Sequence, residues 1–201
     1  MPLVTLIYED EPMCAVMEAL LRCRSEMPEL RLIPCHGCAK IKKNIRAYCK
    51  SAHGSNFYFI MTDLDRNPCA PALVQEWLGG LSHPNFLFRV AVHEVESWLL
   101  ADRENFADFF KVPLNKIPQN PDLEEDPKQK IFELARKSRD TKIRKGVPPA
   151  QYAHAGVYYN SIITEFIRTR WSVSNAAENS PSLKKALQRV QEWNLGNSVE
   201  H

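Results

Sequence analysis

Apolar residues in the first hundred positions form short runs that alternate with amphipathic segments. Four runs are rich in β-branched and aromatic residues, as expected of buried strands, and they cover residues 3–8, 30–35, 56–62 and 85–94. Each run is followed by apolar residues at helical spacing, at 13–23, 39–52, 70–81 and 94–110, the last as one helix or two. Alternating strands and helices favour a parallel sheet. We therefore expect an α/β fold with a mainly parallel four-stranded sheet flanked by helices.

The pattern changes after residue 110. Residues 112–128 contain four prolines, which is typical of a surface connection, and the later apolar patterns are helical, at residues 128–138, 158–171 and 182–193. Asp126 and Ser180 each precede a proline, and a capping residue followed by proline favours the start of a helix. We expect an α/β domain over residues 1–102 and a helical C-terminal extension packed on it over residues 103–201.

Composition places the chain among ordinary globular proteins. Of its 201 residues, 44% are hydrophobic and 25% are charged, which is enough apolar material for a proper core. No apolar run reaches the roughly 18 residues that span a bilayer, and the N-terminal residues lack the pattern of a signal peptide. We expect a cytoplasmic protein without a membrane partner. The net charge of +2 is too small to indicate nucleic-acid binding by itself, so the distribution of charge matters more.

Acidic residues stand at the ends of three predicted strands. Glu9 follows the first strand, Asp63 and Asp65 follow the third, and Glu94 and Glu96 stand at the end of the fourth. Parallel strands end at one edge of their sheet, so we expect these five carboxylates to share that edge. They could hold a hard cation such as Mg²⁺ or Mn²⁺, or form a pair for acid–base chemistry. The alternatives are turn residues for the aspartates and helix N-terminal acids for Glu94 and Glu96.

Cysteines are confined to the first third of the chain. The closest pair is Cys35 and Cys38, in Cys-His-Gly-Cys, which could be half of a zinc site or a redox dithiol. A structural zinc site needs a second ligand pair, and Cys49 and His53 lack the usual spacing. We therefore favour ordinary loop and core thiols over either special role.

Basic residues gather in two stretches. Lys40, Lys42 and Lys43 belong to the predicted helix 39–52. The second stretch lies at the end of the helix after Pro127 and in the following loop, and it includes Lys142, Arg144 and Lys145. Lys128, next to the helix cap at Asp126, could also reach a phosphate. Such stretches are usually solvated faces, but beside an acidic metal site they would also bind a polyanionic backbone with salt-dependent affinity. We expect nucleic acid as the partner.

The order of these elements resembles a known family. A strand ending in glutamate, then helix, strand, helix and a strand ending in Asp-x-Asp is similar to the TOPRIM domain of topoisomerases, primases and nucleases of the overcoming-lysogenisation-defect type. The chain resembles more closely a bacterial TOPRIM-like family related to those nucleases. The similar blocks span nearly the whole chain: YEDE (8–11), TDLDRNPCAP (62–71), VHEVESWLLAD (92–102), DPK (126–128) and SPSL (180–183).

The resemblance implies a TOPRIM-like (Rossmann-like) α/β fold and roles for three residues. Glu9 matches the glutamate taken as general acid/base or metal ligand, and Asp63 and Asp65 match the Mg²⁺-binding aspartates. Many TOPRIM nucleases carry glycine after the first glutamate and a second glutamate four positions on; here those places hold Asp10 and Met13, which leaves Glu11 as the candidate substitute.

Two functional hypotheses follow. The first is a divalent-metal-dependent, nuclease-like enzyme that cleaves phosphodiesters in nucleic acid, with Glu9 handling the proton and the metal stabilising charge. The alternative is a non-catalytic TOPRIM-like module that binds nucleic acid or a partner protein from the same phage-defence or mobile-element locus.

Overall fold

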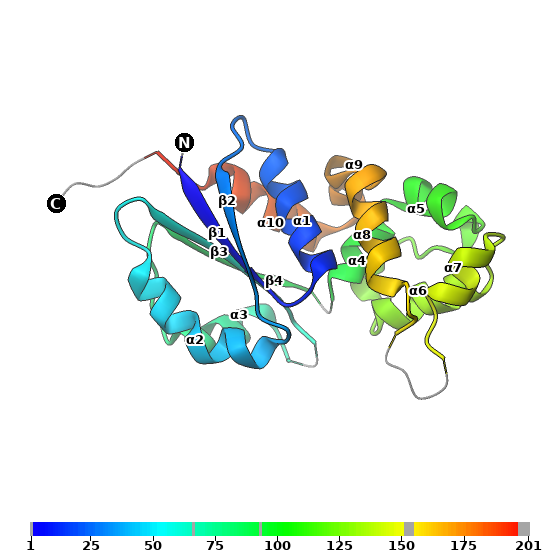
Figure 1. Ribbon diagram of the computed structural model, residues 1–201, viewed down its shortest axis with the longest axis horizontal. Helices are drawn as coiled ribbons and strands as arrows, with labels where there is room; N and C mark the ends of the chain where they lie inside the picture. Colours follow the sequence, from blue (N-terminus) through cyan, green and yellow to red (C-terminus); the bar gives the residue numbers. More distant parts are fainter. Residues whose placement is uncertain (1, 66, 93, 151–154, 197–201) are drawn as a thin grey trace. The chain divides into compact units, whose positions relative to one another are not determined.

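The computed structural model describes residues 2–65, 67–92, 94–150 and 155–196 (Figure 1). The chain divides into two compact units. The first comprises Met1–Ala91 with Ala186–His201, and the second comprises Val92–Lys185. This division differs from the expected one, residues 1–102 and 103–201, in two respects. The helix after the fourth strand belongs to the second unit, and the end of the chain belongs to the first.

The first unit contains the predicted α/β fold. Its four strands are β1 (Leu3–Tyr8), β2 (Glu29–Pro34), β3 (Asn56–Asp63) and β4 (Phe86–Ala91). All neighbouring strands pair in parallel, in the order β2-β1-β3-β4. The expectation of a parallel four-stranded sheet flanked by helices is confirmed. The predicted fourth strand is too long, since β4 ends at Ala91, and His93 lies outside the described residues.

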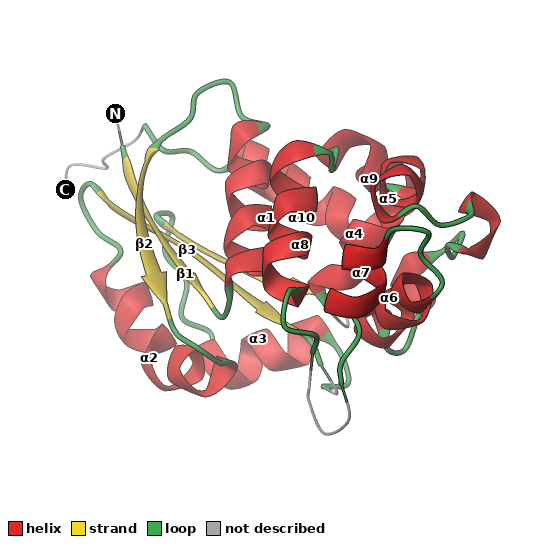
Figure 2. Ribbon diagram, turned by 45° about the vertical axis from the view of Figure 1, so that its right-hand side comes forward, coloured by secondary structure: helices red, strands yellow, loops and turns green. Residues whose placement is uncertain are grey.

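Helices cover both faces of this sheet (Figure 2). One face carries α2 (Cys38–Ser51) and α3 (Ala70–Leu78); the other carries α1 (Glu11–Arg22) and the end of α10 (Pro181–Glu192). The strand order explains this, because the chain moves from β1 to β2 in one direction and from β2 to β3 and β4 in the other. Right-handed crossovers then place α1 on the face opposite α2 and α3.

Two apolar layers hold the first unit together. Ile7, Ile60 and Phe88 point toward α2 and α3 and pack with their buried residues, such as Ile45 and Trp77. Side chains alternate along a strand, so the neighbouring positions face the other layer. There Phe57 and Phe59 contact the Trp193 ring at centroid distances of 5.9 and 6.3 Å. Full burial of such a side chain contributes about 1.5–3 kcal/mol.

In its described part, the second unit contains helices and no strands. It comprises α4 (Val95–Ala101), α5 (Arg103–Phe110), α6 (Pro127–Arg136), α7 (Thr141–Gly146), α8 (Tyr159–Thr169), α9 (Val173–Asn179), the start of α10, and the 3₁₀ turns η1 (Leu114–Lys116) and η2 (Pro121–Leu123). Asp126 caps α6 by accepting a 2.7 Å hydrogen bond from the Gln129 N–H, as its place before proline indicates.

Helix α4 lies at the centre of this second unit. Each of its seven residues is buried, whereas most helices bury a single face. The Trp98 indole donates to Ser182 Oγ at 2.7 Å, and the Trp171 indole donates to the Trp98 carbonyl at 3.1 Å. Asp102 separates α4 from α5 and accepts a 2.7 Å hydrogen bond from the Ser172 N–H. The predicted segment 94–110 is therefore two helices.

Helices long and apolar enough to cross a membrane are absent from the described ranges.

Candidate functional site

The carboxyl edge of the sheet contains the point where the strand order reverses. From β1 the chain proceeds to β2, and from β3 it proceeds to β4 on the opposite side. The connections after β1 and β3 therefore diverge, which is where open parallel sheets usually bind ligands. Glu9 follows β1 directly, and Asp63 is the last residue of β3. The two strands are neighbours, paired from Leu3 with Asn56 to Ile7 with Ile60.

Glu9 connects these two strand ends. One of its carboxylate oxygens, Oε1, accepts a 2.6 Å hydrogen bond from Thr62 Oγ1, and the carboxylate also accepts the backbone N–H of Asp63. Burial raises the pKa of the Glu9 carboxyl above its usual range. Repulsion from Asp65 and Asp10 adds to this effect, and the two hydrogen bonds reduce it. A raised pKa favours the protonated form of this carboxyl, which is the form that donates a proton in acid–base chemistry.

The segment after β3 is anchored in the core and then turns sharply. Leu64 is buried, and its N–H donates to the Ala91 carbonyl at 2.9 Å. Asn67 closes the turn, since its backbone N–H and side-chain amide donate to the Leu64 carbonyl at 3.0 and 2.8 Å. Turn chemistry is therefore present, as the alternative interpretation expected. Asn67 provides a side-chain hydrogen bond in this turn.

Asp65 is exposed at this edge and has a left-handed backbone. Its φ of +48° lies in a region that residues other than glycine rarely adopt, at a cost of about 1 kcal/mol or more. His36, after β2, has a φ of +54°. These two residues follow the carboxyl ends of β2 and β3, whereas Lys111, which also has a positive φ, ends α5.

The departures from the TOPRIM pattern have structural explanations. Asp10 caps α1 by accepting a 3.0 Å hydrogen bond from the Met13 N–H. Met13 is 1% exposed and belongs to the core, where a carboxylate would be unfavourable. Glu11 is exposed in the first turn of α1.

Within the described ranges, no three or more His, Cys, Asp or Glu side chains come close enough to hold a metal ion as a group. Mg²⁺ usually keeps several waters and is bound by one or two carboxylates together with substrate phosphates. Asp63 and Asp65, with Glu9 beside them, offer this kind of oxygen donor.

The Cys-His-Gly-Cys loop lies at the same edge. The buried Cys35 donates its backbone N–H to the Tyr8 carbonyl at 2.8 Å, and Cys38 begins α2. Burial raises the pKa of both thiols; Glu9 raises both further, and Asp65 also acts on Cys38. Thiols that stay protonated are poor nucleophiles and poor metal ligands. All six cysteines are free of disulfides.

The three lysines of the first basic stretch lie on α2 and differ in their contacts. Lys40 lies close enough to Cys35 to lower the pKa of its thiol, and Glu9 raises the same pKa. Lys40 therefore lies near the acidic edge. Lys42 instead pairs with Glu76 at 2.6 Å and lies 5.9 Å from the centroid of the Trp77 ring. Lys43 is exposed.

The second unit contains a polar group around the start of α4. Glu94 Oε2 accepts a 3.0 Å hydrogen bond from the Lys128 N–H, and the Tyr159 hydroxyl donates to Glu96 Oε1. The Lys128 ammonium lies 3.9 Å from Glu96 and 5.0 Å from the centroid of the Tyr159 ring. Burial and the neighbouring Glu96 raise the pKa of Glu94 to about 7. The expectation that Glu94 or Glu96 lies near Glu9 stays a prediction.

The remaining basic candidates of the second unit differ in their contacts. Arg144 donates to the Ser138 carbonyl at 2.7 Å and to Thr141 Oγ1 at 3.1 Å, which is a structural role. Lys142 lies 3.8 Å from Glu165, and both side chains are more than half exposed. Lys145 is exposed.

Sequence reasoning missed two residues at the acidic edge. Thr62 holds Glu9, and Leu64 anchors the aspartate segment. Cys38 was considered only as a zinc ligand or redox thiol, and it lies within electrostatic reach of Glu9. Thr62 could have been found, because it precedes Asp63 in an otherwise apolar strand.

No family model, curated protein or solved structure matches this chain.

Proposed function

We propose that the first unit is a TOPRIM-like domain and that the protein is a divalent-metal-dependent, nuclease-like enzyme that cleaves phosphodiesters in nucleic acid. One observation carries the proposal. Glu9 and the Asp63–Asp65 segment come from neighbouring strands on either side of the point where strand order reverses, and Thr62 and the Asp63 N–H hold Glu9 there. The resemblance assigns catalytic roles to these same residues.

Each residue has a distinct task in this proposal. Asp63 and Asp65 hold Mg²⁺ or Mn²⁺ through carboxylate oxygens and bound waters. The metal, when bound, neutralises charge on the phosphoryl group. Glu9 exchanges a proton with the attacking water or the leaving oxygen, because burial keeps its pKa above the usual range. Its hydrogen bond from Thr62 fixes the orientation of the carboxyl group.

A cation beside this edge supports a phosphate substrate. Lys40, at the start of α2, is close enough to affect the pKa of the Cys35 thiol, as Glu9 does. An exposed ammonium there attracts a phosphate backbone independently of its sequence. Lys42 is the weaker candidate, since Glu76 neutralises it.

The decisive experiment measures cleavage of fluorescently labelled single- and double-stranded DNA and RNA with Mg²⁺ or Mn²⁺. Glu9→Gln should lower the rate about 100-fold or more, because a positioned acid/base usually contributes 10²–10⁴-fold. Glu29→Gln is the matched control. It makes the same chemical change at an exposed site on the opposite edge of the sheet, where Glu29 pairs with Leu3. Equal activity of the Glu9→Gln and control variants would contradict the proposal.

The alternative is a non-catalytic TOPRIM-like module that binds nucleic acid or a protein from the same locus. It is favoured by the lack of a group of three or more metal-binding side chains in the part of the chain that the structure describes. Salt-dependent binding of the same probes, without cleavage under any metal condition, would establish it.

A further inference from the structure

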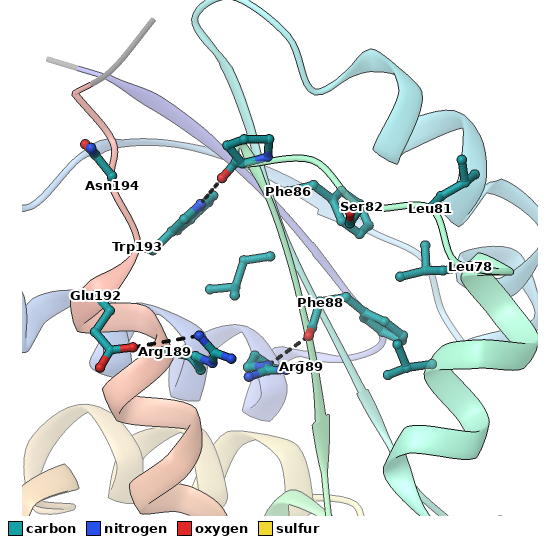
Figure 3. A pocket seen from close by; sticks show the side chains of 13 residues that line it. Leu78, Leu81, Ser82, Phe86, Phe88, Arg89, Arg189, Glu192, Trp193 and Asn194 are labelled. Atoms are coloured by element: carbon teal, nitrogen blue, oxygen red, sulfur yellow. Dashed lines mark hydrogen bonds and ion pairs between the residues drawn. The ribbon is translucent and has the colours of Figure 1, made fainter. Parts of the chain in front are cut away.

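A pocket of about 680 Å³ opens beside β4 in the first unit (Figure 3). Its walls come from β4, from α3 with the loop after it, and from the end of α10. The apolar part of the lining includes Leu78, Leu81, Phe86, Leu87, Phe88 and Trp193. This volume is within the range of small-ligand sites, about 300–1,000 Å³.

The pocket lies away from the acidic edge along the same sheet. Its β4 residues run from Phe86 to Arg89, and Phe86 pairs with Tyr58 near the amino end of β3. Asp63 pairs with Ala91, at the carboxyl end. A ligand in this pocket would therefore not use Glu9 or Asp63, and the inference does not depend on the proposed function.

Two arginines face each other in this lining. Arg89 projects from β4 and Arg189 from α10, and their guanidinium groups lie side by side in Figure 3. Burial lowers the pKa of Arg89, and the charge of Arg189 lowers it further. Like charges this close are unfavourable unless an anion joins them.

The described residues provide no carboxylate for Arg89. Its Nε donates to the Phe88 carbonyl at 2.8 Å, and no ion pair involves it in the described part of the chain. Of the two arginines, Arg189 forms an ion pair with Glu192, at 3.9 Å, and both of these side chains are more than half exposed. One carboxylate offsets only part of the combined positive charge of the two arginines.

The edge of β4 argues against an added peptide strand. In a parallel ladder alternate residues bond to the neighbour, and Asn85 and Ala91 accept from β3, so the carbonyl of Phe88 points outward. Arg89 Nε donates a hydrogen bond to that carbonyl. A fifth strand would have to break this hydrogen bond, whereas a small ligand would leave it intact.

The geometry points to a binding site for a small organic oxyanion, a carboxylate or a phosphate, that carries a flat apolar body. The head group bridges Arg89 and Arg189, whose planar guanidinium groups suit two-pronged recognition of such oxygens. The apolar body lies against Leu87 and Trp193, which lie on the same face of the sheet as Arg89, and leaves water.

Titration calorimetry with 2-naphthoate and 2-naphthylphosphonate tests this assignment, because neither probe can be hydrolysed by a phosphodiesterase. 2-Naphthol lacks the charge, and inorganic phosphate and acetate lack the apolar body. At least one naphthyl anion should bind tenfold more tightly than all three of these. The tighter of the two identifies the preferred head group.

Arg189→Gln should weaken the binding of that anion tenfold or more. Arg189 is exposed on a helix, so the fold should persist, which circular dichroism checks. Arg22→Gln is the matched control, since it removes the same charge from exposed Arg22 on α1, outside the pocket. The assignment is wrong if the Arg189→Gln and Arg22→Gln variants bind alike, if 2-naphthol binds as well as the anions, or if neither anion binds.

Discussion

Glu94 should make the stability of the protein fall as pH rises through neutrality. Its pKa is raised from 4.5 to about 7, first by burial, then by the charge of Glu96, with a smaller contribution from Asp126. The Lys128 N–H and ammonium act in the opposite direction. Between these two pKa values the folded protein binds more protons than the unfolded chain. The contribution to stability is therefore fully present below pH 4.5 and is lost as pH rises through 7.

The size of the effect follows from that shift. A difference of about 2.5 pKa units corresponds to about 3 kcal/mol at full weight, since one unit is about 1.4 kcal/mol. Glu94 is only half-buried, so solvent screening reduces this figure. We expect a loss of about 1–2 kcal/mol in the free energy of unfolding between pH 5 and pH 8 from this group.

Glu94→Gln removes the titration but keeps a side-chain oxygen for the Lys128 N–H. Urea unfolding should show the variant about 1–2 kcal/mol more stable than the wild type at pH 8, and closer to it at pH 5. Glu125→Gln, an exposed carboxyl of the same unit, should follow the wild type. Parallel curves for the wild type and Glu94→Gln, or a wild type more stable at pH 8, would refute this reasoning.

Two further predictions concern the metal and the core. Mn²⁺ should raise the melting temperature of the wild type, because a ligand of the folded state stabilises it, and Asp63→Asn with Asp65→Asn should abolish this shift; an equal shift in the double variant would locate the metal elsewhere. Phe166→Ala should cost about 3–5 kcal/mol in urea unfolding, because the Phe166 ring is fully buried against Phe106 at 5.5 Å and Phe110 at 5.9 Å. Phe166→Leu should cost less, and equal losses would indicate a cause other than the cavity.

The strands and long helices could be predicted because each has a strong hydrophobic period. The first three predicted strands lie within one residue of β1, β2 and β3. The short helices α7 and α9 were missed, since six or seven residues offer too few turns for a helical period. The break between α4 and α5 at Asp102 depends on a hydrogen bond to Ser172, seventy residues later, which no local pattern contains.

The candidate site was predictable in its location and less so in its contacts. Parallel strands must end at one edge, so the convergence of Glu9 with the Asp63–Asp65 segment followed from topology alone. The status of individual lysines did not follow. Lys42 and Lys128 are engaged by Glu76 and by Glu94 and Glu96, which are distant in the sequence. A basic stretch read from sequence therefore overstates the charge left for a ligand.

The acidic edge contains features that destabilise the folded state, and this is the strongest physical reason to assign it a function. A half-buried carboxyl at Glu9 is disfavoured by burial and by Asp65, and the left-handed backbone at Asp65 would cost less with glycine. Neither feature is needed for the turn, because Leu64 and Asn67 already form it. Sequences normally satisfy local rules except at sites where chemistry requires otherwise. Two unfavourable choices at the ends of neighbouring strands, beside the point where the strand order reverses, are what a binding or catalytic site at that edge would require.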